Sequence, residues 1–440
     1  MAGRGLILAA PASGSGKTLI TAGLLRHLRQ RGVRVTAAKA GPDYIDPTFH
    51  AAASGRPCAN LDPWAMRPAI LAGLVSELEA EAELVLCEGV MGLFDGTGPD
   101  GEAGSTAALA RLTGWPVVLV VDARRQGASA AALIGGFARH DPELPLAGVI
   151  FNRVAGSRHR ALLETALARR VPDVPCLGAM PQDPALVLAE RHLGLVPASE
   201  RAECEAVIEH AATVVSESLE FDALLALARP SNLSGAAAVV PLPPLGQRIA
   251  VARDAAFVFA YPAVLDGWRR AGATLSFFSP LADEPSNPDA DAIYLPGGYP
   301  ELHAGRLAMA ERFFSGLRRA ALAGASVYGE CGGYMVLGEA LTDAEGHAHR
   351  MAGLLPLATS FAERRLHLGY RALALLQDGP LGHAGGRFRG HEFHYATTLS
   401  AGGEALFTAA DSCGVDLAPA GLRRGSVAGS FMHLIDREDG

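Results

Sequence analysis

The first residues of the chain place an apolar run, a glycine-rich loop and a helical pattern in direct succession. Residues 5–10 read GLILAA, residues 11–16 read PASGSG, and a helical stretch over residues 18–32 closes at Gly32. This order is that of a phosphate-binding loop, in which backbone N–H groups at a helix N-terminus hold phosphate. Because a strand feeds directly into a helix, the start of the chain is restricted to an α/β fold.

The loop departs from the Walker A pattern G-x-x-x-x-G-K-S/T, because Pro11 stands where the first glycine belongs. Proline has a fixed φ and no N–H, so the start of the loop must have another shape. Lys17 can still neutralise the β and γ phosphates, and Thr18 can ligate Mg²⁺. The expected phosphate-binding N–H groups belong to Gly14, Ser15 and Gly16. The alternative is a flexible Gly/Ser turn before an ordinary helix, and the strand–loop–helix order favours the nucleotide site.

Further apolar runs follow this motif and alternate with helical stretches. The runs lie at residues 33–40, 83–89, 116–123 and 146–154, and a helical stretch over residues 128–140 separates the last two. Runs rich in leucine and β-branched residues that alternate with helices are typical of a mainly parallel sheet with helices on both faces. The first half of the chain is therefore predicted to be an α/β domain.

A change of composition near residue 230 divides the chain, whose 440 residues are too many for one typical domain. Residues 229–247 are rich in Pro, Ser, Gly and Ala and lack helical periodicity, as expected of a linker. A second alternating series of apolar runs and helices begins at residue 248. We predict α/β domains over residues 1–230 and 248–440, each with a mainly parallel sheet, joined by a linker over residues 231–247.

The composition argues against several classes of function. The formal net charge of -8 gives no sign of the basic excess that is typical of nucleic-acid-binding proteins. The six cysteines are scattered, with neither a C-x-x-C pair nor zinc spacing, as expected of reduced thiols in a cytoplasm. Neither a signal peptide nor an apolar run of about 18 residues is apparent, so we expect a cytoplasmic protein without a membrane span.

Two carboxylates lie in a proline-bounded loop after the second predicted strand. The segment KAGPDYIDPTFH places Asp43 and Asp46 three residues apart, with Tyr44 between them and Lys39 before them. Loops at the carboxyl ends of parallel strands face the ligand crevice. We therefore expect Asp43 to bind Mg²⁺, Asp46 to bind Mg²⁺ or orient the substrate, and Tyr44 to contact the substrate. Lys39 is expected to contact phosphate, and a surface Asx-type turn is an alternative for either aspartate alone.

A third carboxylate, Glu88, ends the apolar run ELVLCEG and precedes a glycine-rich segment. An acid at the end of a buried strand beside a phosphate-binding loop is typical of a Walker B acid, which acts on Mg²⁺. Asp95 in the glycine-rich segment is expected to be a turn residue. Asp122 ends the next strand and can sense the metal or the phosphates. Asn152 either contacts the nucleotide base or caps the end of its strand.

The second half of the chain holds a candidate nucleophile, Cys331, in the segment GECGG between an apolar run and a helical pattern. Small neighbours permit a tight strand-to-helix turn, and a helix N-terminus lowers the pKa of a thiol. The N–H of Gly332, with that of Gly298 or Gly297, would form an oxyanion hole. His433 is the candidate base, since the two groups need only meet in space. A buried structural thiol is the alternative.

The segment GHEFHY (residues 390–395) offers two histidines and a glutamate, a set that can bind a metal. Its histidines are three residues apart in a strand-like context, whereas a helical zinc site needs i, i+4 spacing. We therefore favour a structural or substrate-lining role for this segment.

In this order along the chain, five segments resemble those of the cobyrinate or hydrogenobyrinate a,c-diamide synthases: KAGPDYIDPTFH, CEGVMGLFDG, LPGGYPE, GECGGYM and GHEFHY. The resemblance covers essentially the whole chain. The N-terminal half is similar to dethiobiotin synthetase and the C-terminal half to class I glutamine amidotransferases. The resemblance implies amidation of the a and c acetate side chains of a corrinoid polycarboxylic acid, with ATP and Mg²⁺ as cofactors and L-glutamine or ammonia as nitrogen donor.

The resemblance also implies a mechanism. Cys331 would attack the glutamine carboxamide and release ammonia, with His433 carrying protons. ATP would convert a substrate carboxylate into an acyl phosphate, which ammonia attacks. Class I amidotransferases usually carry His-x-Glu, but Leu434, Ile435 and Asp436 follow the histidine here. We therefore expect a Cys–His dyad.

Two other functions stay open on the sequence alone. A cobyric acid synthase would amidate other corrin side chains, although the segment PDYIDP argues against it. A regulatory P-loop ATPase with a vestigial amidotransferase domain is the second alternative, and the intact Cys331 and His433 speak against it. The sequence leaves open whether the corrin contains cobalt and whether the chain forms a homodimer.

Overall fold

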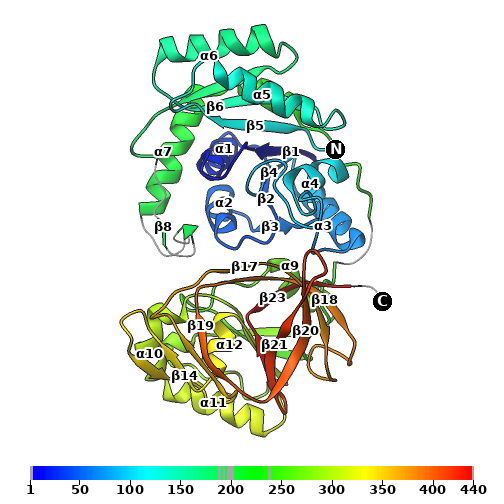
Figure 1. Cartoon of the computed structure of the whole chain (residues 1–440), viewed down its shortest axis with the longest axis vertical. Coiled ribbons are helices and arrows are strands. Elements are labelled where there is room, and N and C mark those ends of the chain that lie inside the picture. Colours follow the sequence, from blue (N-terminus) through cyan, green and yellow to red (C-terminus); the bar gives the residue numbers. More distant parts are fainter. Residues whose placement is uncertain (1–2, 187–189, 192–193, 196–202, 236–238, 439–440) are drawn as a thin grey trace. The chain divides into compact units, whose positions relative to one another are not determined.

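The computed structural model describes residues 3–186, 190–191, 194–195, 203–235 and 239–438 (Figure 1). Contacts divide the chain into two compact units. The first unit comprises Met1–Trp64 and Leu71–Ala237, and the second comprises Ala65–Ile70 and Ala238–Gly440. Residues 236–238, which belong to the predicted linker, lie outside the described residues.

The first unit is built on a seven-stranded sheet in which the recorded strand pairings are parallel. Its strand order is β3-β2-β4-β1-β5-β6-β7. The central strands are almost entirely buried, as expected of a sheet covered on both faces. The strands are β1 (Arg4–Ala9), β2 (Val35–Ala40), β3 (Cys58–Leu61), β4 (Leu84–Glu88), β5 (Val117–Asp122), β6 (Leu146–Val154) and β7 (Cys176–Pro181).

Helices connect these strands and cover both faces of the sheet (Figure 1). Helix α1 packs against α2 and α7, and α5 packs against α6. Because crossovers between parallel strands are right-handed, α1 and α2 cover one face and α3 to α6 cover the other. The elements are α1 (Lys17–Gln30), α2 (Asp46–Ser54), α3 (Pro68–Glu81), α4 (Thr106–Thr113), α5 (Ser129–His140), α6 (Ser157–Arg170), the short strands β8 (Glu190–Arg191) and β9 (Gly194–Leu195), α7 (Glu203–Ser218) and α8 (Phe221–Leu227).

Local sequence explains where two of these helices begin and which face they bury. In α1, the buried residues Ile20, Leu24 and Leu28 recur every four positions and form one apolar stripe. The N-terminus of α4 is capped by Ser105, whose hydroxyl oxygen accepts a hydrogen bond from the N–H of Ala108 at 3.1 Å. These local signals agree with the parallel sheet that the alternating runs predict.

The second unit contains a ten-stranded sheet that is half parallel and half antiparallel. Its order is β11-β10-β12-β13-β22-β21-β20-β17-β18-β23. The pairings from β11 to β22 are parallel, and those from β22 to β23 are antiparallel. Its strands are β10 (Arg248–Ala252), β11 (Thr274–Phe278), β12 (Ala292–Leu295), β13 (Ser326–Glu330), β17 (His367–Leu375), β18 (Arg387–His394), β20 (Glu404–Asp411), β21 (Asp416–Arg424), β22 (Val427–Ser430) and β23 (Met432–Arg437).

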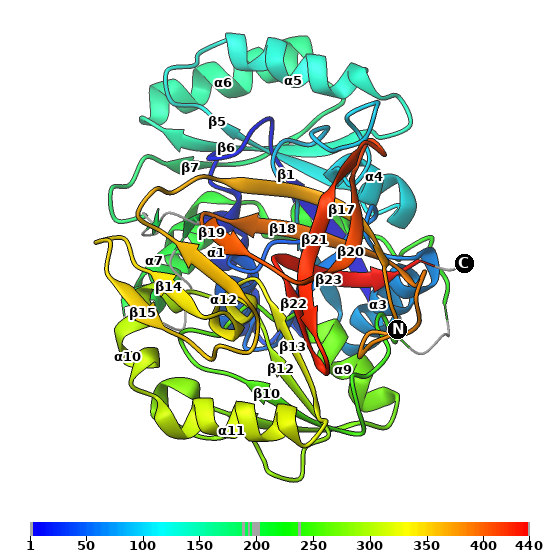
Figure 2. The same cartoon turned by 60° about the horizontal axis from the view of Figure 1, so that its bottom comes forward.

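A smaller four-stranded sheet and four α-helices complete the second unit. The small sheet has the order β15-β14-β16-β19. In Figure 2, the antiparallel strands β18 and β23 lie side by side, as their pairing requires. These elements are α9 (Pro262–Arg270), α10 (Ala304–Ala308), α11 (Glu311–Leu322), α12 (Gly332–Leu337), β14 (Ala340–Thr342), β15 (Ala348–Arg350), β16 (Leu357–Ser360) and β19 (Thr397–Ala401). The expected two-domain α/β fold is confirmed, but the large sheet of the second domain is mixed and not mainly parallel, because its C-terminal strands pair as antiparallel neighbours.

The described C-terminal part of the predicted linker packs within the second unit. Val239, Leu242 and Leu245 are buried. The indole N–H of Trp268, in α9, donates a hydrogen bond to the carbonyl oxygen of Pro243 at 3.1 Å. These residues behave as part of the core of the second unit and not as a free connection.

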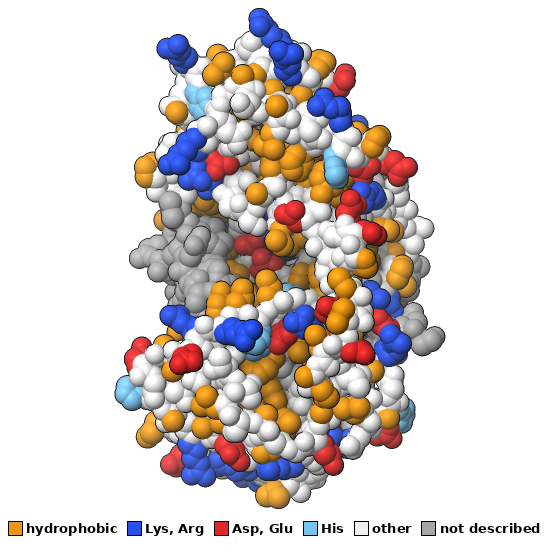
Figure 3. All heavy atoms as spheres, viewed as in Figure 1, with side chains coloured by type: hydrophobic (Ala, Val, Ile, Leu, Met, Phe, Trp, Pro, Cys, Tyr) orange, Lys and Arg blue, Asp and Glu red, His pale blue; other side chains and the backbone are white. Residues whose placement is uncertain are grey.

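Two further findings concern membrane-spanning helices and surface charge. Among the described residues, no helix is both long and apolar enough to cross a membrane. On the face shown in Figure 3, Lys and Arg side chains stand out over α6, whose sequence SRHRALLETALARR carries four arginines. Basic, acidic and apolar side chains are interspersed over the rest of this face, so it does not present one continuous basic surface.

Candidate active sites

The predicted site residues of the first unit come from the carboxyl ends of neighbouring parallel strands. The glycine-rich loop follows β1, Lys39 lies near the end of β2, Glu88 ends β4, and Asn152 lies near the end of β6. The strands β2, β4, β1, β5 and β6 are consecutive in the sheet. Side chains that are distant in sequence therefore meet at one edge of the sheet, where α/β folds bind ligands.

The loop between β1 and α1 needs glycine at two positions. Gly14 and Gly16 have φ values of 76° and 95°, in the left-handed region. A Cβ on Gly16 would also lie 2.2 Å from Nδ2 of Asn152. Nδ2 of Asn152 donates to the carbonyl oxygen of Ser15 at 2.8 Å, and the Ser15 hydroxyl donates to that of Ala12 at 2.8 Å. The structure thus places Asn152 against the backbone of the loop.

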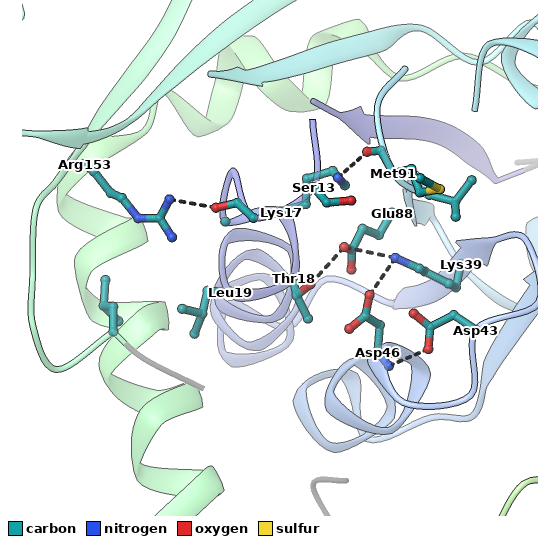
Figure 4. Close-up of a pocket in the computed structure, with 14 residues that line it drawn as sticks. Ser13, Lys17, Thr18, Leu19, Lys39, Asp43, Asp46, Glu88, Met91 and Arg153 are labelled. Carbon is teal, nitrogen blue, oxygen red and sulfur yellow. Dashed lines mark hydrogen bonds and ion pairs between the residues drawn. The ribbon is translucent and has the colours of Figure 1, made fainter. Parts of the chain in front are cut away.

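Arg153 is a site residue that the sequence reasoning missed. Its Nη1 donates to the carbonyl oxygen of Gly14 at 2.8 Å and pairs with Oδ2 of Asp122 at 2.7 Å. Figure 4 shows Arg153 reaching the loop from the side opposite the acidic residues. Asp122 also pairs with Arg124 at 2.8 Å. Asp122, the expected phosphate or metal sensor, therefore pairs with two arginines. The sequence showed only that Asp122 ends a strand.

A pocket of about 380 Å³ opens beside the loop (Figure 4). Tyr44 is half-buried and does not belong to the described lining of this pocket. Asn152 lines a separate cavity of about 30 Å³ together with Arg153 and Met180. The pocket brings together predicted phosphate contacts and predicted metal ligands, namely Gly14, Gly16, Lys17, Thr18, Lys39, Asp43, Asp46 and Glu88.

Glu88 is the centre of a buried network of charged groups. Nζ of Lys39 lies 3.1 Å from Oε1 of Glu88 and 2.7 Å from Oδ2 of Asp46. Oε1 of Glu88 also accepts a hydrogen bond from the Thr18 hydroxyl at 3.0 Å, and Oε2 lies 2.5 Å from Nε2 of His50. Figure 4 shows the labelled members converging on one side of the pocket. His50 was missed because it resembles an ordinary helical residue of α2.

The network retains its charges despite burial. Burial favours neutral Glu88, but the opposing charge of Lys39 is decisive and holds the pKa of Glu88 well below its usual range. Burial likewise opposes the charge of Lys39, but Asp46 and Glu88 raise its pKa. Lys17 differs, because burial lowers its pKa, and its Nζ donates to the carbonyl oxygen of Met91 at 2.6 Å. Burial therefore leaves Lys39 in its charged form but opposes the charge of Lys17.

Asp43 shapes the loop that it belongs to. Its Oδ1 accepts hydrogen bonds from the N–H groups of Ile45 at 2.7 Å and Asp46 at 3.2 Å, which is an Asx-type turn. Nδ2 of Asn60 donates to the carbonyl oxygen of Asp43 at 2.7 Å. Burial and then Asp46 raise the pKa of Asp43. The turn that the sequence left as an alternative is present, and the same side chain lines the pocket.

In the second unit, Cys331 stands between β13 and α12 with a φ of 46°. This conformation is rare for a side-chain-bearing residue and marks a sharp turn. The N–H of Cys331 donates to the carbonyl oxygen of Ser430 at 2.8 Å. A Cβ on Gly329 would lie 2.7 Å from the carbonyl carbon of Gly333, and one on Gly333 would lie 2.0 Å from the carbonyl oxygen of Leu295. The predicted strand-to-helix turn therefore depends on glycine.

Cys331 and His433 meet beside Gly297. A Cβ on Gly297 would lie 2.3 Å from Cε1 of His433 and 3.3 Å from Cβ of Cys331. The two side chains thus border the same point, although His433 lies in β23 and Cys331 follows β13. The structure brings together two groups that are about a hundred residues apart in the sequence.

The two predicted oxyanion-hole residues are also neighbours. A Cβ on Gly332 would lie 3.0 Å from the backbone nitrogen of Gly298. A Cβ on Gly298 would lie 2.2 Å from the carbonyl oxygen of Ala256. Glycine at both positions therefore lets two backbone segments approach each other next to Cys331.

Burial shifts the pKa values of Cys331 and His433 in opposite directions. Burial and then Glu301 raise the pKa of the Cys331 thiol, and the N–H of Gly332 offsets this only in part. Burial also lowers the pKa of His433 to about 3. The expectation that the helix N-terminus provides a thiolate is therefore wrong for this state, because the six-residue α12 does not outweigh desolvation. The pair is a neutral thiol beside a neutral imidazole.

The residues that follow His433 do not supply a carboxylate to it. Ile435, two positions later, is apolar and buried. Asp436, three positions later, accepts hydrogen bonds from Nη2 of Arg67 at 3.0 Å and from its backbone N–H at 2.7 Å. Arg67 belongs to the segment Ala65–Ile70, which is part of the second unit. The usual His-x-Glu position is therefore occupied by a core residue.

The GHEFHY segment forms the end of β18. Its Glu392 pairs with Nη2 of Arg371 at 2.6 Å and with Nε2 of His394 at 3.1 Å. His367 stacks on His394 with ring centroids 4.6 Å apart, and ligand atoms of these two histidines and Glu392 lie within 4.8 Å of one another. Arg371 and His394 thus both pair with Glu392, and the structural or substrate-lining role of this segment stays a prediction.

Comparison with known proteins covers both units. Residues 6–196 match the family described as CobQ/CobB/MinD/ParA nucleotide binding domain, and residues 248–439 match the CobB/CobQ-like glutamine amidotransferase domain. Proteins named hydrogenobyrinate a,c-diamide synthase are similar over 98% of this chain. That of Brucella anthropi is 56% identical and covered over 98% of its length, and that of Rhizobium meliloti is 54% identical and covered over 99%.

Proposed function

The chain belongs to the hydrogenobyrinate a,c-diamide synthase family, and from this membership we propose that it amidates the a and c acetate side chains of hydrogenobyrinic acid. The nitrogen comes from glutamine, and ATP activates each carboxylate. One observation carries the proposal beyond similarity: a phosphate loop with a buried acid–lysine network and a Cys–His pair occur in the same chain.

The first unit supplies the groups for activating a carboxylate. A carboxylate resists attack by ammonia because its leaving group is poor, and transfer of the γ-phosphoryl group of ATP creates a good one. Gly16 is the N-cap of α1, and the N–H groups of the loop at Gly14, Ser15 and Gly16 would bind phosphate at this helix N-terminus. Lys17 and Lys39 stabilise the negative charge that moves during transfer. The charged state of Lys39, secured by Glu88, suits it to this role.

The same unit fits a magnesium ion. The Thr18 hydroxyl and the Glu88 carboxylate lie in hydrogen-bond contact at 3.0 Å, and both offer oxygen ligands of the kind that Mg²⁺ prefers. Asp43 lines the same pocket, but one of its oxygens is engaged in a turn, so we expect it to act through a water molecule. Thr18, Glu88 and Asp43 would hold Mg²⁺, which would supply positive charge against the phosphates. Asp46 and Tyr44 remain predicted substrate contacts.

The second unit supplies the groups for releasing ammonia. His433 is neutral and takes the proton of Cys331 as the sulfur attacks the carboxamide carbon of glutamine. The N–H groups of Gly298 and Gly332 stabilise the oxyanion that forms. Collapse of this intermediate breaks the C–N bond, and His433 returns the proton to the departing ammonia. Water then hydrolyses the thioester to glutamate and restores Cys331.

The choice of hydrogenobyrinic acid over the cobalt-containing cobyrinic acid rests on the names of the relatives. A cytoplasmic location remains a prediction that rests on the scattered cysteines. A homodimer remains a prediction.

The decisive experiment incubates the purified protein with ATP, Mg²⁺ and either glutamine or ammonium, and with hydrogenobyrinic or cobyrinic acid. We expect mass changes of one and then two amidations, with hydrogenobyrinic acid as the better substrate. Neither mass change with either acid would contradict the proposed reaction. A clear preference for cobyrinic acid would retain the reaction and overturn the choice of substrate.

A further inference from the structure

Besides Cys331 and His433, a thiol site of this kind usually has a carboxylate that assists the histidine. Here that carboxylate cannot come from the segment that follows His433. Ile435 is a core residue there, and Asp436 is bound to Arg67. An imidazole that accepts a proton from a thiol gains from a carboxylate beside its other nitrogen, because the carboxylate fixes the ring and stabilises its cation. The question is therefore which part of the fold provides such a group.

Glu330 lies in the required place. It ends β13 and directly precedes Cys331. Its side chain is 3% exposed, and its Oε2 lies 4.0 Å from Nδ1 of His433, which is 1% exposed. Nδ1 is the ring nitrogen of His433 that forms the recorded pair with Glu330. The nucleophile and the carboxylate thus come from adjacent residues on one strand end, and the base comes from another strand.

Two hydrogen bonds hold the Glu330 carboxyl group in this position. The Tyr294 hydroxyl donates to Oε2 at 2.8 Å, and the backbone N–H of Leu434 donates to Oε1 at 3.2 Å. Because Leu434 directly follows His433, Glu330 binds the backbone next to His433 and also lies beside its imidazole ring. These hydrogen bonds to both oxygens offset part of the cost of burying the Glu330 carboxyl group.

We propose that Glu330 is the positioning residue of the thiol site, which orients His433 and stabilises its cation. This inference rests on the glutaminase part of the proposed function. As His433 takes the thiol proton at Nε2, the ring becomes an imidazolium with N–H at Nδ1. The Glu330 carboxyl group, 4.0 Å from Nδ1 in the buried core, then faces this positive charge, which favours its ionised form. The proton leaves His433 with ammonia, and the ring returns to neutral.

The test compares Glu330→Gln with Asp436→Asn, the variant at the acid nearest the usual sequence position. In Glu330→Gln, we expect kcat for glutamine hydrolysis to fall at least about 100-fold while KM for glutamine stays within about threefold. Asp436→Asn is expected to keep kcat within about threefold. Glu330→Asp retains a carboxylate, so its kcat is expected to be at least about tenfold higher than that of Glu330→Gln. A kcat near wild type in Glu330→Gln would overturn the proposal. Equal losses of kcat in Glu330→Gln and Glu330→Asp would also overturn it.

A second readout separates this inference from the proposed corrin reaction and from misfolding. The electrophilic glutamine analogue 6-diazo-5-oxo-norleucine alkylates an activated cysteine without any corrin or ATP. We expect its reaction with Cys331 to slow at least about 100-fold in Glu330→Gln, whereas ammonia-dependent amidation stays within about threefold of wild type. Unchanged alkylation overturns the role of Glu330. Normal alkylation in the wild type without corrin amidation would instead count against the proposed substrate.

Discussion

The phosphate site and the thiol site treat charge in opposite ways. In the first unit, buried Lys39 and Glu88 hold each other in their charged forms, and Asp46 adds to the stabilisation of Lys39. In the second unit, buried Cys331 and His433 are both held in their neutral forms. Both sites are equally removed from water, so burial alone does not decide the outcome. The partners of each group decide it.

This difference corresponds to the ligands that each site takes. A polyphosphate arrives with several negative charges, and preorganised charges stabilise it without rearrangement. Glutamine arrives uncharged at its reacting amide, and a neutral pair receives it without an ion to desolvate. Charge appears in the thiol site only during the reaction. Variants that act on one site and not on the other therefore test the comparison directly.

The largest effect is expected from Lys39→Met, which leaves Glu88 and Asp46 without their buried cation. Amidation should fall at least about 10³-fold with glutamine and with ammonia alike, because phosphoryl transfer serves both donors. Alkylation of Cys331 by the glutamine analogue should be unchanged. Product mass and alkylation rate are the measurements. The matched control is Arg34→Met, which removes an exposed pair with Glu83 and should leave both rates unaltered.

Cys331→Ala should affect amidation with glutamine and amidation with ammonia differently. Glutamine-dependent amidation should fall at least about 10³-fold, because no other group can form the thioester. Ammonia-dependent amidation should stay within about threefold. Cys413→Ala, at an exposed cysteine, serves as the control and should retain both rates. Equal losses with glutamine and ammonium in Cys331→Ala would contradict a two-site mechanism.

Gly297→Ala should damage the thiol site by sterics alone. The added methyl group would lie 2.3 Å from Cε1 of His433 and must displace the imidazole. We expect glutamine-dependent kcat to fall roughly 100-fold, as small misplacements of a reacting group do. Gly305→Ala, whose methyl group would lie 3.5 Å from its nearest neighbour, is the control. A wild-type rate in Gly297→Ala would mean that His433 works in another position.

Arg67→Met should weaken the fold of the second unit without changing its chemistry. It leaves Asp436, which is fully buried, without its ion pair. Breaking a buried pair by removing one partner costs about 3 kcal/mol. Urea unfolding should show this loss, and kcat for glutamine hydrolysis by the folded protein should stay within about threefold. A large fall in kcat with unchanged stability would assign Asp436 to the thiol site and sharpen the choice against Glu330.

The smallest effect concerns pH. Burial raises the pKa of Glu330 from 4.5 to about 8. The folded state therefore binds this proton more tightly than the unfolded state, so stability falls as pH rises from 4.5 to about 8. Glu330→Gln removes this dependence. Relative to wild type, the variant should gain stability between about pH 5 and about pH 8, as measured by urea unfolding. A constant difference across this range would contradict the raised pKa.

Local spacing made much of the first unit predictable. The strand, loop and helix at the start of the chain are contiguous, and the helix expected over residues 18–32 is found at Lys17–Gln30. Asp95 is a turn residue as expected, since its Oδ2 accepts from the N–H of Gly92 at 2.9 Å. The carboxyl-edge rule then placed Asp43 and Glu88 in one pocket. These features depend on short stretches of chain and on one general property of parallel sheets.

Contacts between distant segments could not be predicted. His50 lies in α2 but binds Glu88 at the end of β4, and nothing in its own neighbourhood distinguishes it from a core histidine. Glu330 reaches His433 through the pairing of strands about a hundred residues apart. The pKa of Cys331 was misjudged because the sequence shows a helix start but not the degree of desolvation. The antiparallel half of the second sheet likewise depends on long-range pairing.

The burial of Cys331 has a practical consequence for labelling the protein. Cys413 is exposed, whereas Cys331 is 2% exposed and its thiol is neutral. Maleimide dyes react with accessible thiolates, so a brief reaction should attach a fluorophore to Cys413 and leave the nucleophile intact. Because Cys176 is only half-buried, its replacement by alanine would leave Cys413 as the accessible site for one reporter.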